Sequence, residues 1–569
     1  MFQSRIPAAF HHALGAALLS IACWQACITS VASAAVYTVG SDVDCDHLTI
    51  PDALVVAAGT AADDELRLAE DQWNLSLTLA NWDPDGFQGG LTITGGYTSC
   101  TEARAGARGT ASRTLLDGTS SGPVVSVTNT TPGPSVVTLR NLLIKGATSD
   151  RGLAVLNADV TLENTRIEDN VGGILVDRGS LTADETTEVF LNDAGTDDGG
   201  GLLCLRGSAQ FAGTLQQNEA SLGGGVYVAA TCELTLAGGS QLIGNVATYG
   251  GGAYVAAGTL IGLPEPDEFG PQFIQNEATQ RGGGLYLTSQ GEADLFNSWI
   301  VSNFADISGG GVEIDNGRFT MQRLAAGCLV DTPGSPCSLL SQNRLFSLSS
   351  TITGSAVNIS DNGTVTIKQT NVRGNKGPEG SISPTVIEGN GLFSTIRLES
   401  VAFVENQTSI VLRIRQGFLF ADFISMSLNE PASLLSDTAV ASSALDLGEV
   451  WMTSSVLENV NGFLGTTDID CVIADDLQGV GVTATRSQEL AGPHFVQPSL
   501  NDMRLLPTSP AVDYCGNLDV EPTTTDAAGN PRPVDALDVA DLHGTYDLGA
   551  FERVGIFSDG FESGTTAAW

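Results

Sequence analysis

Lysine is almost absent from this chain of 569 residues, where it occurs only at Lys145, Lys368 and Lys376. Lysine and arginine together number 25 against 65 aspartates and glutamates, so the formal net charge is −40. A surface this acidic repels nucleic acid and anionic membranes, and we expect neither as a partner. It also repels anionic polysaccharides unless a cation or a local basic patch intervenes. Such a charge is typical of a soluble protein in a salty or extracellular medium.

Long apolar runs are missing as well. After the first residues, no stretch approaches the ~18 consecutive apolar residues of a membrane-spanning helix. Residues 1–34 are typical of a secretory signal peptide, with Arg5 before an apolar segment at 13–21 and a cleavage site at Ala32-Ser33-Ala34. We therefore expect a secreted or cell-surface protein with no membrane span in its mature chain.

Histidine is scarce, and beyond the signal segment only His47, His494 and His543 remain. No Ser-His-Asp or Cys-His arrangement can be nominated, and no C-x-x-C motif indicates zinc. Eight cysteines follow the signal segment, an even number typical of disulfides in an exported protein. Sequential pairing is the simplest hypothesis, although the connectivity stays open. The candidates are Cys45, Cys100, Cys204, Cys232, Cys328, Cys337, Cys471 and Cys515.

Two of these pairs can be judged from their surroundings. Cys328 and Cys337 flank a Pro/Gly turn, which favours a bond between them. Cys204 and Cys232 are less well matched, because the glycine repeat described next aligns Cys204 with Val228, four residues before Cys232.

Glycine and asparagine, by contrast, recur in one repeated sequence motif: an asparagine, a few residues, three glycines and a short apolar strand. A repeat of 24 to 32 residues is one supersecondary unit that buries its apolar face only by stacking on its neighbours. Each repeat offers three short strands, such as 226–230, 233–236 and 240–245. We therefore predict an all-β, right-handed parallel β-helix with three sides and coils ~4.8 Å apart. The triplets begin at Gly199, Gly223, Gly250, Gly282 and Gly309.

The register of the repeats predicts which side chains point inward. After each triplet, the first and third residues of the strand are apolar. Because side chains alternate between the two sides of a strand, these residues are expected in the core. The second positions are then outside, where Tyr227, Tyr254 and Tyr286 form an external stack that ends at Glu313. The glycines suit a turn with positive φ. The repeated asparagines predict a ladder of side-chain amides at a turn, formed by Asn218, Asn245, Asn276 and Asn303.

The coils are expected to fill residues 101–470, because asparagines continue at a looser spacing after the triplets end. Residues 35–100 are predicted to form an N-terminal cap and first coil. In that segment Thr49 is a helix N-cap, and an apolar helix at 52–59 ends at Gly59. Residues 471–555, rich in Pro, Asp and Gly, are predicted to be an irregular C-terminal cap before a short tail at 556–569. The later asparagines are Asn375, Asn406, Asn429 and Asn459.

Three segments resemble known families. The glycine and asparagine repeats at 170–315 resemble those of polymorphic outer membrane proteins and, more broadly, of bacterial right-handed β-helix proteins. Residues 37–58 with 93–100 look like the N-terminal cap of pectate-lyase-like proteins. MRLLPTSPAVDYCG at 503–516 and YDLGAFE at 546–552 resemble the choice-of-anchor Q region, which closes a β-helix ahead of an anchoring signal. These resemblances imply the fold, and they imply little about function because many activities share the scaffold.

Basic residues concentrate in the later coils. The segments TIKQT and TIRLES align approximately, so Lys368 and Arg397 could stack on one outer face. A stripe of cations there is the candidate binding face for the carboxylates of an anionic glycan. A solvated face balanced by nearby acids is the alternative. The stripe consists of Lys368, Arg397, Arg413 and Arg415.

No cofactor is predicted, with calcium as a possibility. Asp83 and Asp85 precede a glycine and could offer carboxylate ligands, although an ordinary polar turn is the alternative. RIR at 413–415 resembles the basic motif of polygalacturonases, whose Gly-His-Gly motif the chain lacks. Acidic doublets such as Asp197-Asp198 point to opposite sides of a strand, so they are no catalytic pair.

These observations predict a secreted or cell-surface rod without catalytic activity. We expect it to act in recognition, adhesion or structure, with an extracellular glycan or a cell-surface protein as its partner. The alternative is a carbohydrate-active enzyme, either a polysaccharide lyase acting on an anionic glycan or a glycoside hydrolase. No pattern in the sequence indicates an oligomeric state.

Overall fold

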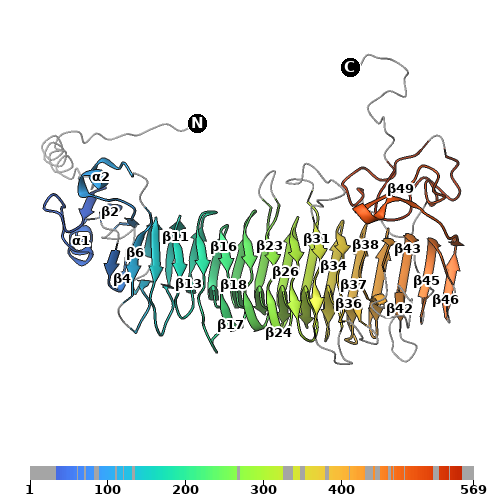
Figure 1. Cartoon of the computed structure of the whole chain (residues 1–569), viewed down its shortest axis with the longest axis horizontal. Helices are drawn as coiled ribbons and strands as arrows, with labels where there is room; N and C mark the ends of the chain where they lie inside the picture. Colours follow the sequence, from blue (N-terminus) through green and yellow to red (C-terminus); the bar gives the residue numbers. More distant parts are fainter. Residues whose placement is uncertain are drawn as a thin grey trace, which may run out of the picture.

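The computed structural model shows a long rod of parallel strands, with helices at its N-terminal end and an irregular layer along one side near its C-terminal end (Figure 1). The residues that the structure describes are 34–60, 62–69, 72–82, 89–108, 112–118, 121–130, 135–264, 269–324, 338–346, 353–378, 384–408, 410–429, 440–442, 449–458, 463–464, 467–477, 479, 481–516, 524–536 and 539–553. No helix among them is long and apolar enough to cross a membrane.

Each coil contributes strands to three parallel sheets, which we call the first, second and third faces. Partners come from adjacent coils: Tyr227 pairs with Tyr254 on the first face and Leu242 with Phe273 on the third. The predicted three-sided parallel β-helix is confirmed.

The first face contains β4 (Leu77–Ala80), β7 (Val125–Thr128), β10 (Leu153–Leu156), β21 (Ala253–Ala256), β25 (Leu285–Thr288), β29 (Val312–Asp315), β33 (Val357–Ile359), β36 (Thr385–Gly389), β39 (Ile410–Ile414), β42 (Val440–Ser442) and β44 (Phe463–Leu464). Three long strands pass from the first face to the second: β13 (Ile174–Ala183), β15 (Leu202–Phe211) and β18 (Val226–Leu236).

The second face contains β1 (Val36–Val39), β2 (Asp64–Leu68), β5 (Leu91–Thr94), β8 (Ser135–Arg140), β11 (Ala158–Glu163), β22 (Thr259–Gly262), β26 (Glu292–Phe296), β30 (Arg318–Gln322), β34 (Thr364–Lys368), β37 (Thr395–Glu399), β40 (Phe418–Asp422) and β46 (Val482–Thr485). Two strands pass from it to the third face: β43 (Glu449–Leu457) and β45 (Thr467–Ala474).

The third face contains β3 (Gln72–Asn74), β6 (Thr114–Asp117), β9 (Leu142–Lys145), β12 (Arg166–Glu168), β14 (Glu188–Phe190), β16 (Thr214–Gln216), β19 (Gln241–Ile243), β23 (Gln272–Ile274), β27 (Trp299–Val301), β31 (Leu339–Ser341), β35 (Asn371–Arg373), β38 (Ala402–Val404), β41 (Ser425–Ser427) and β47 (Gln488–Glu489).

Alternation along each strand fills the interior, as the sequence predicts. On β21, for example, Ala253 and Val255 are fully buried in the core while Tyr254 points outward. Phenylalanines fill the interior of every second coil in this part of the rod, at Phe211, Phe273 and Phe319. Burial of this continuous apolar column is the main force that holds coil on coil.

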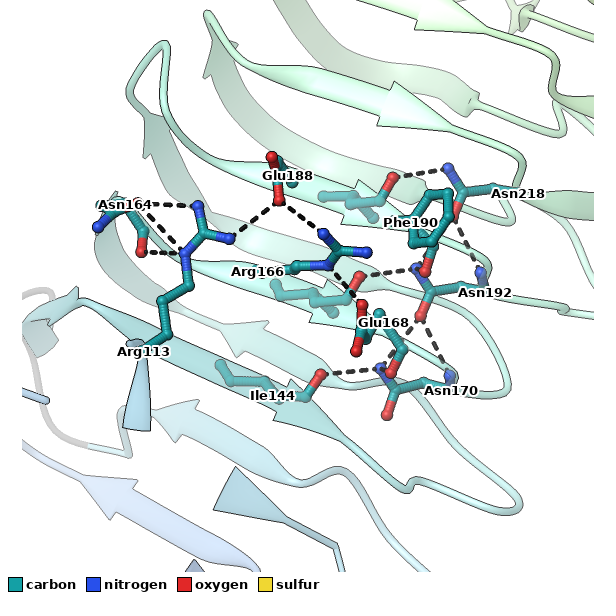
Figure 2. Close-up of polar contacts among 12 residues, drawn as sticks. Arg113, Ile144, Asn164, Arg166, Glu168, Asn170, Glu188, Phe190, Asn192 and Asn218 are labelled. Carbon is teal, nitrogen blue, oxygen red and sulfur yellow. Dashed lines mark hydrogen bonds and ion pairs between the residues drawn. The ribbon is translucent and has the colours of Figure 1, made fainter. Parts of the chain in front are cut away.

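The asparagine ladder is confirmed and is longer than predicted. From Asn192 onward, each side-chain oxygen accepts the backbone N–H and the side-chain amide of the asparagine one coil earlier, whereas the oxygen of Asn170 accepts from the N–H of Ala147. Each amide also donates to a carbonyl of an earlier coil. Figure 2 shows this for Asn170, Asn192 and Asn218. Asn459 lies outside the described residues. The ladder residues are Asn170, Asn192, Asn218, Asn245, Asn276, Asn303, Asn343, Asn375, Asn406 and Asn429.

The glycine triplets follow from backbone geometry. Gly250 has φ +67°, a conformation that strains other residues, and a Cβ there would lie 2.4 Å from the carbonyl oxygen of Ala253. A Cβ at Gly251 would lie 2.3 Å from the carbonyl oxygen of Glu277 in the next coil. The triplet therefore lets two coils approach where a side chain would separate them.

Between the asparagine and the glycines, five coils form a fourth, small parallel sheet at the corner of the third and first faces. We call this sheet the ridge. Its buried side chains, Ala278, Ala305 and Leu345, form a core of their own, separate from that of the rod. The ridge consists of β17 (Glu219–Leu222), β20 (Val246–Tyr249), β24 (Glu277–Arg281), β28 (Phe304–Ala305) and β32 (Arg344–Leu345).

The N-terminal end carries helices α1 (Ile50–Ala57) and α2 (Cys100–Ala105). Thr49 is the N-cap of α1 and accepts from the N–H of Asp52, as predicted. The helix ends at Ala57, two residues before the predicted Gly59, and Ala58 is its C-cap, with right-handed helical angles and an N–H that donates to the carbonyl of Leu54. Its buried side packs on the core of the first coils.

Three of the four sequential disulfides are present. They join Cys45 to Cys100, Cys204 to Cys232 and Cys471 to Cys515. Cys204 does pair with Val228 in the strand register, and the disulfide spans the offset at the corner of the first and second faces. Cys328 and Cys337 lie outside the described residues. Disulfides of this number indicate folding in an oxidising compartment.

The C-terminal segment covers the third face after the last coil strand, β47. It contains an antiparallel pair, β48 (Phe495–Gln497) and β49 (Asp502–Leu505), and the short 3₁₀ helix η1 (Pro498–Leu500). Apolar cap residues such as Met503 and Leu548 pack on outward side chains of the third face such as Val404. Near the corner with the second face, Arg532 is fully buried over the ring of Phe423 and lies 3.4 Å from Glu552.

Candidate binding groove on the first face

One column of outward side chains on the first face changes from aromatic to charged along the rod. The strand register places one of its residues on each coil, so neighbours in the column lie one strand spacing apart. In order, the column is Leu203, Tyr227, Tyr254, Tyr286, Glu313, Asn358, Glu388 and Arg413.

The tyrosines stack as the sequence predicts. Tyr227 and Tyr254 have ring centroids 5.4 Å apart, and Tyr254 and Tyr286 have centroids 5.0 Å apart, with nearly parallel planes. Their ring faces are occupied by one another, so their edges and hydroxyls are the parts that a ligand would meet. Burial raises the pKa of Tyr254 to about 12 and also raises that of Tyr286, so both are neutral hydrogen-bonding groups at physiological pH.

The ridge adds a wall to this outward stack, which the sequence did not predict. Tyr249 on β20 meets the Tyr286 ring edge to face at 5.5 Å, and its hydroxyl donates to Gln280 on β24. Side chains of the ridge therefore form a wall beside the tyrosine floor. Between them is a groove of 370 Å³, a size within the range of ligand pockets, ~300–1,000 Å³. It is lined by Leu222, Tyr249, Tyr254, Gln280, Arg281, Tyr286 and Asp315.

Glu313 follows Tyr286 in the column; it is fully buried and is not among the residues that line the groove. The side-chain amide of Asn358 donates to both of its carboxylate oxygens, at 3.1 and 3.0 Å. Arg281 Nη1 lies 3.6 Å from Oε1. Burial raises the pKa of Glu313 to about 7, against the lowering effect of Arg281 and Asn358. Two residues further on, Asp315 accepts from the Tyr286 hydroxyl at 3.2 Å.

A second acid lies near the other end of the tyrosine stack. Burial and the adjacent Asp197 raise the pKa of Asp198, while Arg151 lowers it. The guanidinium of Arg151 donates to the backbone carbonyls of Asp198 and Gly199, which fixes the turn that carries this carboxylate. The surroundings of the groove thus hold more acidic than basic groups.

The same column continues into a buried polar cluster. The hydroxyl of Thr385 donates to Glu388 at 2.8 Å, and Arg413 and Arg415 lie 3.5 and 2.7 Å from the same carboxylate. Glu388 is fully buried, so these two arginines neutralise an internal charge.

The predicted basic stripe is divided between two faces. Lys368 and Arg397 lie on β34 and β37 of the second face, whereas Arg413 and Arg415 belong to the first face. Arg397 pairs with Thr366 in the register, and Lys368 pairs with Glu399, so the predicted stacking of the two cations is wrong by two residues.

Each of these second-face cations has its own contact. Lys368 Nζ lies 2.7 Å from Glu399, and the guanidinium of Arg397 lies 4.6 Å from the centroid of Phe420. The stripe is therefore two separate pairs of cations with local partners. Whether any of the four binds a glycan stays a prediction.

The calcium candidates Asp83 and Asp85 lie outside the described residues. Within the described part of the chain, one group of three acids could hold a metal ion, and it lies in the C-terminal cap away from the groove. It consists of Asp513, Asp535 and Asp541, whose carboxylate oxygens lie within 4.8 Å of one another. Burial and neighbouring acids raise the pKa of Asp513 to about 6.

Comparison of the chain with protein-family models gives no match, and comparison with the curated proteins gives none. The case for a function therefore depends on the geometry of the rod itself.

The sequence predicted the tyrosine stack that forms the floor of the groove, but not the side chains of the ridge that form its wall. Gln280 and Arg281 stand just before a glycine triplet, where the repeat suggested only a turn. A usable signal was there: several repeats place long side chains directly before the triplet, namely Leu222, Tyr249 and Arg281. In a stacked fold, residues at one repeat position form one surface.

Proposed function

We propose that this protein is an exported, non-catalytic rod that recognises an extracellular glycan in the groove between its first face and its ridge. The observation that carries the proposal is the groove itself, which three coils build from tyrosine edges, an amide and a guanidinium. The disulfides support export, because they need an oxidising compartment.

The lining favours a ligand rich in hydroxyl groups. Neutral tyrosine hydroxyls, the amide of Gln280, the Arg281 guanidinium and the Asp315 carboxylate supply both donors and acceptors. A sugar chain offers hydroxyls of both kinds and ring C–H groups that fit aromatic edges. A folded protein partner would need a far larger contact area than this groove provides.

The charges favour an uncharged glycan over an anionic one. Asp315 lines the groove, Asp198 and Glu313 lie near the two ends of the tyrosine stack, and the one arginine of the lining already lies against Glu313. Elsewhere arginines are engaged in the same way: Figure 2 shows Arg166 between Glu168 and Glu188 on the outside of the third face. A sugar carboxylate would have to compete with these internal partners, against a net charge of −40.

Glycan binding is tested by calorimetric titration with the neutral oligosaccharides that an array first identifies. Gln280→Ala removes a groove amide and Glu277→Ala removes an exposed side chain from the same ridge strand, so the second variant is the matched control. We expect Gln280→Ala to weaken binding about three- to tenfold, as for the loss of one hydrogen bond. Equal affinities of the two variants, or no neutral glycan bound by the parent protein, would refute the proposal.

The prediction of an anionic ligand is tested on the same array. Arg397→Glu reverses a cation on the surface of the second face, away from the buried cluster around Glu388. If the parent protein binds pectin or alginate fragments and Arg397→Glu does not, the second face is the binding surface and the groove is not.

A second candidate function is glycoside hydrolysis. The observation that favours it is the pair Glu313 and Asp315 on one strand, because glycoside hydrolases use two carboxyl groups and burial raises the pKa of Glu313 to about 7, as a general acid requires. A depolymerisation screen against pectin, alginate and neutral glycans, with and without calcium, decides between the two. Turnover that Glu313→Gln abolishes would establish the enzyme, and absence of any turnover leaves the recognition rod.

A further inference from the structure

A second hollow lies at the opposite edge of the first face, where the chain turns onto the second face. It has a volume of 290 Å³, close to the lower limit of ~300 Å³ for ligand pockets. Three successive coils build it, and a loop from a fourth closes one side. We call it the corner hollow; it is lined by Gln290, Glu292, Asn316, Gly317, Arg318, Asn362, Gly363, Thr364 and Phe393.

Phe393 is the unusual member of this lining. Its side chain is 72% exposed although it is held in place, because its backbone N–H donates to the side-chain oxygen of Asn362 at 3.2 Å. The neighbouring Leu392 is also exposed but does not line the hollow. An exposed aromatic face beside polar groups suits a ligand with polarised C–H groups, because the ring face carries partial negative charge.

The polar lining repeats from coil to coil. Gln290, Asn316 and Asn362 stand at the same turn of three successive coils and offer amide donors and acceptors. The single arginine, Arg318, is held by Glu292 at 2.8 Å and by Asp294 at 2.8 and 3.0 Å. These two carboxylates outnumber the cation, so the hollow is unfavourable for an anionic ligand.

We propose that the corner hollow is a second saccharide site, which holds one uncharged sugar residue with its ring C–H groups on Phe393 and its hydroxyls on the amides. The volume allows a single ring and excludes a folded chain. The ligand class rests on the proposed function of the groove, but the residues that carry this site are different.

The two sites lie on the same coils. Gln290 follows the groove residue Tyr286 by four positions, with a turn of positive φ at Ser289 and Gln290, so at most ~13 Å of chain separates the hollow from the groove floor at ~3.3 Å per residue. Asp315 lines the groove and Asn316, next in sequence, lines the hollow. One glycan chain can therefore cross the first face and occupy both sites at once. Tethering of this kind makes affinity rise steeply with chain length.

The test uses the whole protein and a length series of neutral β-1,4-linked glucose, mannose and galactose oligosaccharides, followed by calorimetry and saturation-transfer NMR. Phe393→Ala removes the ring, and Leu392→Ala removes a similar exposed apolar side chain outside the hollow. Phe393→Trp keeps an aromatic face. We expect Phe393→Ala to weaken binding of the longest oligomer about fivefold or more, the scale of one aromatic contact. Leu392→Ala and Phe393→Trp should stay within about twofold of the parent.

The outcomes separate the two sites. If Gln280→Ala weakens binding and Phe393→Ala matches Leu392→Ala, the corner site is refuted and the groove stands. If only Phe393→Ala weakens binding, the corner site stands and the groove is refuted. Equal affinity of short and long oligomers would overturn simultaneous occupation of both sites, and failure of the parent to bind any member of the series overturns both.

Discussion

Removal of one interior asparagine from the ladder is the sharpest test of what holds the coils together. The side chain of Asn276 takes part in four hydrogen bonds: its oxygen accepts from the backbone N–H and the amide of Asn245, both at 3.0 Å, and its amide donates to Leu242 at 2.9 Å and to Asn303 at 3.0 Å. All three asparagine and leucine partners are fully buried.

The cost of Asn276→Ala follows from these bonds. The N–H of Asn245 would be left buried without a partner, which costs ~1–3 kcal/mol, and each of the other three bonds contributes ~0.5–1.5 kcal/mol. Since such terms are not additive, we expect a loss of about 3–5 kcal/mol. In a stacked fold this loss falls on the neighbouring coils and spares distant ones.

Hydrogen exchange followed by mass spectrometry measures this locally. A loss of about 3–5 kcal/mol corresponds to a hundredfold to several thousandfold faster exchange, at tenfold per ~1.4 kcal/mol, in the strands β16, β19 and β23. Coils near β8 should keep their protection. Glu277→Ala, one residue away and exposed on the ridge, is the control and should change stability by less than ~0.5 kcal/mol. Asn276→Ala variants that exchange like this control would refute the account of the ladder.

Three further outcomes follow from the buried groups. Because the folded pKa of Glu313 is raised to about 7 from 4.5, the folded state holds an extra proton between these values, and stability falls as pH rises through that window. Between pH 5 and pH 8, urea unfolding should show a fall in stability that is about 2–3 kcal/mol larger in the parent than in Glu313→Gln; identical pH slopes would contradict it. Replacing Cys204 and Cys232 by serine should lower the unfolding free energy by about 3.5 kcal/mol for a closed loop of 28 residues, and an unchanged urea midpoint would count against this. Ultraviolet titration should show Tyr254 ionising only near pH 12, whereas its ionisation near pH 10 would show that the ridge does not cover it.

The repeated parts of this fold were predictable because every coil needs the same turn and the same buried apolar positions. An asparagine at the turn, a glycine at positive φ and alternating apolar residues have the same role in each copy, so spacing alone revealed them. Asn343 escaped detection because it lies 40 positions after Asn303, in a longer repeat, and no glycine triplet follows it.

The functional surface was less predictable because it depends on where unlike segments meet. The tyrosine column was predicted, but the ridge beside it was not. The sequence of β24 is typical of a turn, and this segment forms part of a sheet only because it pairs with β20 and β28. The predicted stacking of Lys368 on Arg397 was wrong for a related reason. Coils differ in length, so approximate alignment of two segments can miss the register by two residues, enough to place Lys368 beside Glu399 instead of Arg397.

The C-terminal cap has a consequence for the order in which the chain assembles. Coil contacts join residues a few tens of positions apart, as in the pairing of Leu242 with Phe273, so each coil can dock as soon as it follows its predecessor. The cap departs from this pattern: the Gln369 side chain donates to Thr525, 156 residues later, at 2.7 Å. The apolar outer surface around Val404 therefore stays uncovered after its coils have formed, until the C-terminal segment packs on it. A chain stopped short of that segment would present this surface as a site of aggregation while its remaining coils were already formed.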